Sequence, residues 1–463
     1  MKLSSAPEQS GTLRRRLLLV GLCAGYVLCL QWIYNNWLYP VFAYFGFDYI
    51  DPPGGYVLLG WILSLLPSLW MPLRLSRPSQ MAYWVLYLTV LVPSLFFPLY
   101  ARLDSLPDIG LLMLTMFAGF AITGLSYLLP LIPVRESQVS NASFWTGLTL
   151  LFGLLVLWVF AVFRDQMSFL SFYDVYDLRS GAEDLLEGRN VNYALMLLSG
   201  AVNPFLMGWG LYHRRKLAIA AGIFGQLVIY SSMGTKGSLL SIVFILGFYI
   251  LSRNERIPFG LKVVGCIVGL LAVLSLATYF ISGQNLDSDS NPFLFMLFSV
   301  IFMRTFCING VLTGQYFDFF QNNPQTYYSH IKGVSWFAHY PYANTPGIEV
   351  GSFYSGDPTL DATAHFWAAD GLAAWGLAGV LLISVLCALV FWMLDSCSQR
   401  HDIRLVVLVT CYTAFNLSNI SIFTTLLSGG LLLLMMLLYL LPAKTPHGFR
   451  AEPASALQPV LQS

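Results

Sequence analysis

The stretch that decides the fold lies at residues 371–393 and reads GLAAWGLAGVLLISVLCALVFWM. It contains no Asp, Glu, Lys or Arg. A helix needs about 20 consecutive, mostly apolar residues to cross the hydrocarbon core of a bilayer. An uncharged apolar run of at least this length is typical of a transmembrane helix, and we expect one here.

The composition extends this expectation to the whole chain. Of the 463 residues, 57% are hydrophobic and 10% are charged, whereas a soluble domain has about 45–50% apolar and about 25% charged residues. So apolar a chain excludes soluble enzymes and disordered tails. The chain has 24 Lys and Arg residues and 23 Asp and Glu residues. The two signs of charge nearly cancel, so the chain lacks the basic excess that is typical of nucleic-acid-binding proteins. The predicted class is a polytopic membrane protein.

The predicted fold is all-α, a single transmembrane domain over residues 1–463 with about twelve transmembrane helices. Arg14, Arg15 and Arg16 precede the first apolar run, which continues to about Trp37 without a small-x-small cleavage site. We therefore expect an uncleaved first helix and no signal peptide. The expected spans are 17–36, 56–73, 82–100, 109–133, 143–163, 192–212, 217–233, 237–252, 263–281, 371–393, 404–419 and 424–441.

The distribution of charge predicts the orientation. With the N-terminus in the cytoplasm, most Lys and Arg residues fall in cytoplasmic segments and most acids fall outside, as the positive-inside rule requires. Both termini are then cytoplasmic, and residues 442–463 form a cytoplasmic tail. The basic residues predicted to lie outside are Arg102, Arg164, Arg179, Arg189, Lys236, Arg304 and Lys332.

Two outer loops, 164–191 and 282–370, are long, and long ordered loops usually carry function. The second contains FLFMLFSVIFM at 293–303. This run is too short to span a bilayer, so we expect it to lie in the interface or to re-enter the membrane. The residues after it are rich in Tyr, Trp, Gly and Asn, a mixture that suits sugar rings. The alternative is an aromatic belt at the membrane surface.

Four of the outer basic residues are candidates for binding a phosphate group. An Arg guanidinium matches phosphate oxygens in pairs, and a Lys ammonium acts as a point charge. A cluster at the edge of the bilayer would suit the diphosphate of a lipid-linked substrate. The alternative is that each pairs with a nearby acid such as Asp174 or Asp318. The four are Arg304, Arg179, Lys236 and Arg189.

The segment DATAHFWAAD, residues 361–370, offers candidates for acid–base chemistry. On a helix, Asp361 and His365 share one face, and a histidine near an acid titrates close to neutral pH. The alternative is that these residues form the polar mouth of the tenth span. His339 is a weaker candidate. No P-loop and no zinc-ligand spacing is present, so we expect no metal and no other cofactor.

The chain resembles the Wzy-type O-antigen polymerases, the enzymes of bacterial inner membranes that polymerise oligosaccharide repeat units. The resemblance implies an all-helical fold of the kind grouped with membrane-embedded C-type glycosyltransferases. The family's arginine-bearing pair of periplasmic loops falls on Arg179 with Arg189 and on Arg304. The stretches that carry the resemblance are LQWIYNNWLYPVFAYFG (30–46), residues 168–215, MGTKGS (233–238), MRTFCINGVLTGQYFDFF (303–320) and DPTLDATAHFWAADGLAAWGLAGV (357–380).

The resemblance implies a polymerase that transfers a growing glycan from undecaprenyl diphosphate onto a repeat unit on the same carrier, at the periplasmic face. A chain-length regulator protein is a possible partner, and nucleic acid is not. Three alternatives stay open: an O-antigen ligase, a polysaccharide transporter or lipid-carrier flippase, and a structural partner of a chain-length regulator. The expected catalytic residues are Arg304, Arg179 and His365, and the expected diphosphate- or sugar-binding residues are Lys236, Arg189, His339, Tyr340 and Asp361.

Overall fold

The computed structural model describes residues 6–168, 190–253, 256–283, 286, 290–331 and 333–442, with side chains from residue 12 onward. All regular structure in this part of the chain is helical. Eleven of its helices are long and apolar enough to cross a membrane. The prediction of an all-α polytopic membrane protein is therefore confirmed at this level.

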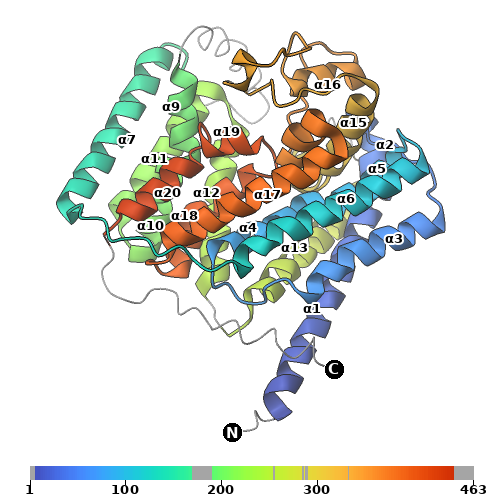
Figure 1. Ribbon diagram of the computed structural model, residues 1–463, viewed down its shortest axis with the longest axis horizontal. Coiled ribbons are helices and arrows are strands. Elements are labelled where there is room, and N and C mark those ends of the chain that lie inside the picture. The colour runs from blue at the N-terminus through green and yellow to red at the C-terminus, as the bar shows by residue number, and fades with distance from the viewer. Residues whose placement is uncertain are drawn as a thin grey trace.

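The helices are numbered along the chain (Figure 1). They are α1 (Ala6–Ile33), α2 (Tyr39–Val41), α3 (Gly54–Leu65), α4 (Pro78–Leu86), α5 (Val92–Ala101), α6 (Leu106–Gly124), α7 (Asn141–Phe163), α9 (Val191–Leu197), α10 (Asn203–His213), α11 (Lys216–Met233), α12 (Lys236–Arg253), α13 (Phe259–Ser282), α14 (Pro292–Phe298), α15 (Ile308–Asn322), α16 (Pro346–Ser355), α17 (Ala373–Ser398), α18 (Ile403–Asn416), α19 (Ile422–Leu426) and α20 (Leu431–Leu440).

Short π-helical segments join several of these helices into longer rods. A π-turn widens the helix by one residue, and such turns are frequent at functional sites. The segments are η1 (Tyr34–Leu38), η4 (Tyr87–Leu91), η6 (Leu198–Val202), η7 (Ser299–Cys307) and η9 (Trp367–Leu372).

Most predicted spans coincide with a helix of membrane-spanning length, and two do not. The helix at 56–73 covers only Gly54–Leu69 and the one at 404–419 only Ile403–Asn416. Both are apolar but shorter than the other spans. The first ends where a 3-10 turn with Pro67 replaces the α-helix, because proline has no N–H to continue the ladder. The second ends in turns from Leu417 onward.

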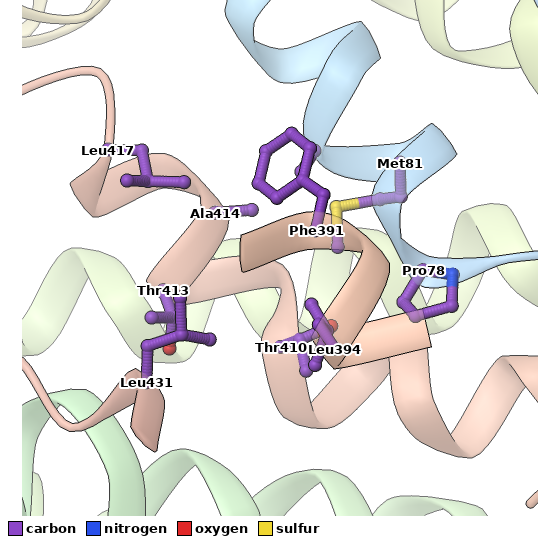
Figure 2. A pocket seen from close by; sticks show the side chains of 10 residues that line it. Pro78, Met81, Phe391, Leu394, Thr410, Thr413, Ala414, Leu417 and Leu431 are labelled. Carbon is purple, nitrogen blue, oxygen red and sulfur yellow. The ribbon is translucent and has the colours of Figure 1, made fainter. Parts of the chain in front are cut away.

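The rod α4–η4–α5 forms the centre of the bundle. Every residue from Pro78 to Ala101 is buried, and none is charged. A helix that is apolar all round belongs in an interior. The rods of α6, α15, α17 and α18 pack around it. One gap remains between α4, α17, α18 and α20 (Figure 2), with a volume of about 10 Å³, room for about one water molecule, and an almost entirely apolar lining.

The bundle has two ends, which we call the upper and lower ends after Figure 1, where α16 lies at the top. At the lower end, basic side chains donate hydrogen bonds to backbone carbonyls. Arg16 Nη1 lies 2.5 Å from the Met71 oxygen, and Arg77 Nη1 lies 2.6 Å from the Leu129 oxygen. The guanidinium of Arg400 likewise donates to the carbonyl of Val134. The bonds from Arg77 and Arg400 hold the extended segment 129–139 across the lower end.

The helix that contains the apolar run at 293–303 does not end with that run at Arg304. Helical structure continues from Pro292 to Asn322, long and apolar enough by length and composition for a span. The helix continues because its polar residues find partners inside the bundle. Asn309 donates to the Thr89 carbonyl over 2.9 Å, and the Thr313 hydroxyl lies 2.7 Å from that of Ser94.

Both ends of this long helical segment contact the upper end of the bundle. Near its start, Phe295 stacks on Phe42, just beyond the end of α2. Its middle reaches Tyr26, deep in α1, through Phe306. Near its other end, Asp318 accepts a hydrogen bond from Tyr354 of α16. These contacts are those of a segment that enters the bundle and returns, with the Phe306–Tyr26 contact between its two ends.

Candidate functional site

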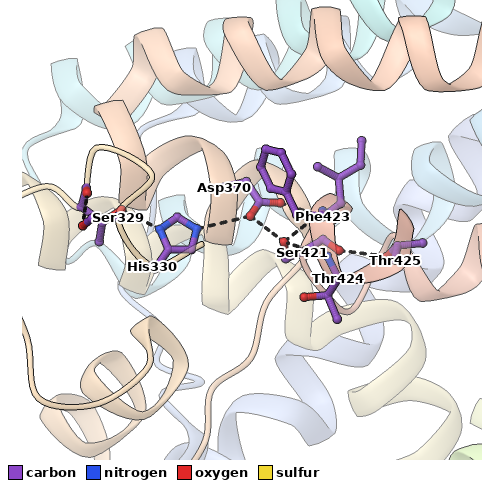
Figure 3. Close-up of polar contacts among 9 residues, drawn as sticks. Ser329, His330, Asp370, Ser421, Phe423, Thr424 and Thr425 are labelled. Carbon is purple, nitrogen blue, oxygen red and sulfur yellow. Dashed lines mark hydrogen bonds and ion pairs between the residues drawn. The ribbon is translucent and has the colours of Figure 1, made fainter. Parts of the chain in front are cut away.

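A buried acid–histidine pair lies at the upper end, near the start of the α17 rod (Figure 3). Asp370, in η9, is completely buried, and its Oδ1 lies 3.5 Å from Nε2 of His330, the outer limit of a hydrogen bond. The Ser421 hydroxyl donates to Oδ1 over 2.7 Å, and the backbone N–H of Ile422 donates to Oδ2 over 2.7 Å. The first turn of α19 thus holds the carboxylate, and the carboxylate faces the imidazole.

The surroundings of His330 favour one neutral tautomer. Its Nε2 faces the Asp370 carboxylate, which only accepts, so Nε2 is the nitrogen that carries the proton. Its Nδ1 lies 2.8 Å from the Thr326 hydroxyl and accepts a hydrogen bond from it. The His330 side chain is 10% exposed. An imidazole held by a carboxylate on one nitrogen, with an unprotonated second nitrogen, has the arrangement of a general base.

The turn that carries His330 is strained. Tyr327 and Tyr328 have φ values of +47° and +63°, in the left-handed region that costs a non-glycine residue about 1–3 kcal/mol. Two backbone bonds hold the turn against α17, from Thr326 N to the Ala373 oxygen (2.8 Å) and from Tyr327 N to the Ala374 oxygen (3.1 Å). Strain of this kind persists only where the surroundings enforce it.

The α17 rod is broken directly beside this turn. Trp375 (φ −145°) and Gly376 (φ +55°, ψ −139°) leave the helical conformation. The break leaves the carbonyls of Ala373 and Ala374 available to the His330 turn. It also borders a cavity of about 220 Å³, which we call the break cavity. Its lining residues are Phe317, Phe320, Gln321, Gln325, Leu372, Trp375, Gly376 and Leu377.

The structure does not support the expected role of His365. Residues 361–365 are extended and not helical, so Asp361 and His365 do not share a helix face. His365 is completely buried, with Nε2 2.9 Å from the Thr313 hydroxyl and Nδ1 3.4 Å from the Ala368 N–H. Burial lowers the pKa of His365 to about 3, whereas the sequence predicted titration near neutral pH. This histidine links α15 to the start of the α17 rod as a neutral group.

Arg304 lies in η7 with an exposed side chain, and its guanidinium carbon is 5.2 Å from the centre of the Phe45 ring. This cation–π contact holds the group at the upper end. Lys236 begins α12 and is half-buried. Arg179 and Arg189 lie outside the described residues, as do most of the predicted loop 164–191 and all but the first residue of the tail 442–463.

The remaining predicted binding residues lie in the segments around α16. His339 is exposed, and Tyr340 donates its hydroxyl hydrogen to the Asn344 carbonyl over 2.6 Å. Asp361 is exposed and accepts a hydrogen bond from the Thr363 hydroxyl over 2.7 Å. The buried Tyr316 hydroxyl donates to the carbonyl of Ala362, the residue after Asp361, over 3.1 Å.

A group of acids also lies at the upper end, between α5, α6 and α15. Burial, followed by the charges of Asp318 and Asp108, raises the pKa of Asp104 to about 7. Asp318 accepts a hydrogen bond from the Tyr354 hydroxyl. Near neutral pH this group carries less negative charge than its composition suggests.

The sequence analysis included Asp370 in the segment 361–370 that offers candidates for acid–base chemistry, but it did not find the partner of this carboxylate. A charged residue at the mouth of a span is costly unless it is paired, and this cost was the available signal. Nothing in the local sequence pointed from Asp370 to His330, forty positions away, or to the break at Trp375. Tertiary packing alone creates both features.

Within the ranges that the structure describes, no three His, Cys, Asp or Glu side chains come together as a metal-binding group. Comparison with family models, curated proteins and solved structures found no match to this chain.

Proposed function

We propose that this protein is a membrane-embedded glycosyltransferase that polymerises lipid-diphosphate-linked oligosaccharide units at its upper end. The observation that carries the proposal is the His330–Asp370 pair, which lies beside the break cavity and at the same end of the bundle as the exposed Arg304. A base, a cavity and a cation are the parts that transfer of a glycan from a diphosphate requires.

The proposed orientation places the upper end in the periplasm. Arg16, Arg77 and Arg400 lie at the lower end, where their side chains donate to backbone carbonyls. Lys and Arg concentrate on the cytoplasmic side of membrane proteins. This distribution supports a cytoplasmic lower end in a bacterial inner membrane.

In the proposed reaction, a hydroxyl oxygen of the acceptor sugar attacks the anomeric carbon of the donor glycan. The bond from that carbon to the diphosphate oxygen breaks, and the diphosphate leaves with the bonding electrons. The acceptor hydroxyl replaces the Thr326 hydroxyl as the donor to His330 Nδ1. Nδ1 then takes its proton, and the Asp370 carboxylate stabilises the imidazolium that forms. The diphosphate is already a good leaving group, so the reaction needs no nucleotide.

Arg304 has the proposed role of stabilising the departing diphosphate. Negative charge develops on the leaving oxygen, and a cation already in place stabilises this charge without reorganising. Arg179, Arg189 and Lys236 remain candidates for the same role, since the sequence places them in the loops or turns of the same predicted side. His365 is not the proposed base, because it is completely buried and its partners are the Thr313 hydroxyl and the Ala368 N–H, whereas His330 is 10% exposed and faces a carboxylate.

An O-antigen ligase and a transporter are the rival functions. A transporter usually has charged residues in the middle of its spans, whereas the buried acids Asp370 and Asp395 lie toward the ends of the α17 rod. Asp395 accepts hydrogen bonds from the first turn of α4, through Ser79. A ligase shares the donor chemistry and differs in its acceptor.

The test uses purified protein in nanodiscs with a synthetic undecaprenyl-diphosphate trisaccharide and no nucleotide. A polymerase produces a ladder of products that differ by one trisaccharide. The sample is divided, and a lipid A-core acceptor is added to one half. Transfer only to the lipid A-core identifies a ligase. Absence of product in both halves, with protein shown to be folded, contradicts the proposal.

A further inference from the structure

We infer that the break cavity binds a single uncharged sugar ring. The inference rests on the proposed function for the source of that ring, a lipid-linked glycan. The cavity, its lining and its position beside His330 carry the argument, as follows.

Three segments of the chain build the cavity: the end of α15, the residue before Thr326, and the broken part of α17. Glycine is required at the break. The positive φ of Gly376 is unfavourable for any L side chain, and a Cβ there would lie 3.0 Å from Nε2 of Gln325. The chain therefore has a conformation at this point that leaves room for the glutamine amide and for a ligand.

The lining offers the groups that a sugar requires. Trp375 is 47% exposed, and an indole face packs well against the apolar C–H face of a pyranose. Gln321 and Gln325 each have an amide that both donates and accepts. Within the described part of the chain, neither amide makes a side-chain hydrogen bond. Hydroxyl groups, which also donate and accept, are their natural partners.

The charge and the size of the cavity narrow the ligand. No Asp, Glu, Lys or Arg lines it, so its lining has no charged group to offset the free energy of desolvating a phosphate or a carboxylate. Its volume of about 220 Å³ lies below the roughly 300–1,000 Å³ of sites for drug-sized molecules. One uncharged ring suits this volume better than an oligosaccharide.

The position of the cavity indicates which sugar ring it would bind. Gln325 directly precedes Thr326, which bonds to His330, and Leu372 lies two positions after Asp370. His330 and Asp370 do not themselves line the cavity, and Gln325 and Leu372 connect its lining to the acid–histidine pair. The cavity thus holds the sugar whose hydroxyl the base activates, while Arg304 acts on the diphosphate.

The experiment measures saturation-transfer NMR from the full-length protein in nanodiscs to free sugars. The probes are glucose, galactose, N-acetylglucosamine, glucuronate and glucose 6-phosphate. We expect transfer to at least one uncharged sugar and weaker transfer to both anionic sugars. Gln325→Leu and Trp375→Leu should weaken binding about threefold to tenfold, the effect of one lost hydrogen bond or ring contact.

Two matched variants control for the chemical change alone. Gln138→Leu alters an exposed glutamine in the segment 129–139, and Trp158→Leu alters a tryptophan of α7 that is 45% exposed and lies outside the cavity lining. Both should bind as the wild type does. Three results overturn the inference: no sugar binds, anionic sugars bind best, or Gln325→Leu and Trp375→Leu both bind normally.

This measurement needs no catalysis, so it separates the two proposals. Sugar binding without ladder formation removes the polymerase proposal and leaves the sugar site. Ladder formation without sugar binding, or with binding that Gln325→Leu and Trp375→Leu leave unchanged, removes the sugar site and leaves the polymerase.

Discussion

At the scale of single residues, Arg304 shows how an aromatic ring holds an exposed cation in place. Its guanidinium lies over the Phe45 ring, and its backbone is part of the helical segment η7. We predict that Arg304→Ala lowers the rate of polymer formation about 10²–10³-fold, as loss of an electrostatic stabiliser does. Arg304→Lys should recover part of this rate, because it keeps the charge but not the planar fork. Initial rates of ladder formation provide the measurement.

The control for this prediction is Arg164→Ala. Arg164 is also an exposed arginine, with Asp165 as its ion-pair partner at 3.4 Å, and it should leave the rate unchanged. If Arg304→Ala makes full-length polymer at the wild-type rate while the protein level is normal, Arg304 has no part in catalysis.

His365 gives a prediction about pH and stability. Its pKa is about 3 when folded and about 6.5 when unfolded. Between these two pKa values His365 binds a proton in the unfolded chain but not in the folded chain. Its contribution to the free energy of unfolding is therefore lost as pH falls from about 7 toward 3. The loss reaches at most about 1.4 kcal/mol per pH unit.

His365→Gln tests this sign, since glutamine does not titrate but still offers polar atoms to Thr313. We expect the difference in unfolding free energy between wild type and variant to shrink, or to change sign, as pH falls from 7 to 5. Chemical denaturation in detergent at each pH measures it. A difference that stays constant with pH contradicts the neutral, buried state of His365.

The histidines also show what residue-level sequence reasoning can reach. It identified the aromatic and polar character of the upper segments and did not single out Asp370. It paired His365 with Asp361 because a helix would bring positions four apart together, but the chain is extended there. The actual partner of Asp370 is His330, and only the fold brings these two together.

At the scale of elements, the break in α17 is the feature with the clearest energetic consequence. Gly376 has φ +55° and ψ −139°, a region that only glycine adopts readily. We predict that Gly376→Ala destabilises the protein by about 1–3 kcal/mol and weakens sugar binding. Thermal unfolding in detergent and the saturation-transfer experiment measure the two effects.

Gly153→Ala is the matched change. Gly153 lies within α7, and a Cβ there meets nothing within 4 Å. Alanine in a regular helix is favoured over glycine by up to about 1 kcal/mol, so this variant should be as stable as the wild type or more so. Equal effects of the two substitutions would mean that the break imposes no special conformation.

Hydropathy predicted where most of the helices lie, but it did not predict where a helix breaks or continues past a charged residue. It located nearly all the spans, because burial in lipid or protein demands an apolar run. It stopped at Arg304, although the helix continues to Asn322. The polar residues Asn309 and Thr313 find hydrogen-bond partners on η4 and α5, and a local sequence pattern does not reveal a partner that lies on another helix.

At the scale of the whole molecule, the proposed orientation makes a labelling prediction. In a background without the native cysteines, His339→Cys should react with a membrane-impermeant maleimide in intact spheroplasts. Gln138→Cys, on the segment 129–139 at the lower end, should react only after permeabilisation. Both native side chains are exposed, so access to the reagent and not burial decides the outcome. The reverse pattern would place the upper end in the cytoplasm and refute the proposed orientation.

The sequence therefore predicts the class of the molecule and the course of most of its spans, since both follow from apolar length. The candidate site was predictable only in part. Arg304 and the aromatic loop stand out in the sequence, whereas the break cavity and the His330–Asp370 pair depend on contacts between segments far apart in the chain.

The segment from Pro292 to Asn322 begins and finishes beside α2, α5 and α16. A segment that returns to the end of the bundle where it began does not cross from one end to the other. The helices that follow it therefore have the same direction that they would have without it. The segment from Pro292 to Asn322 therefore adds side chains to the upper half and leaves the direction of α17 to α20 through the bundle unchanged.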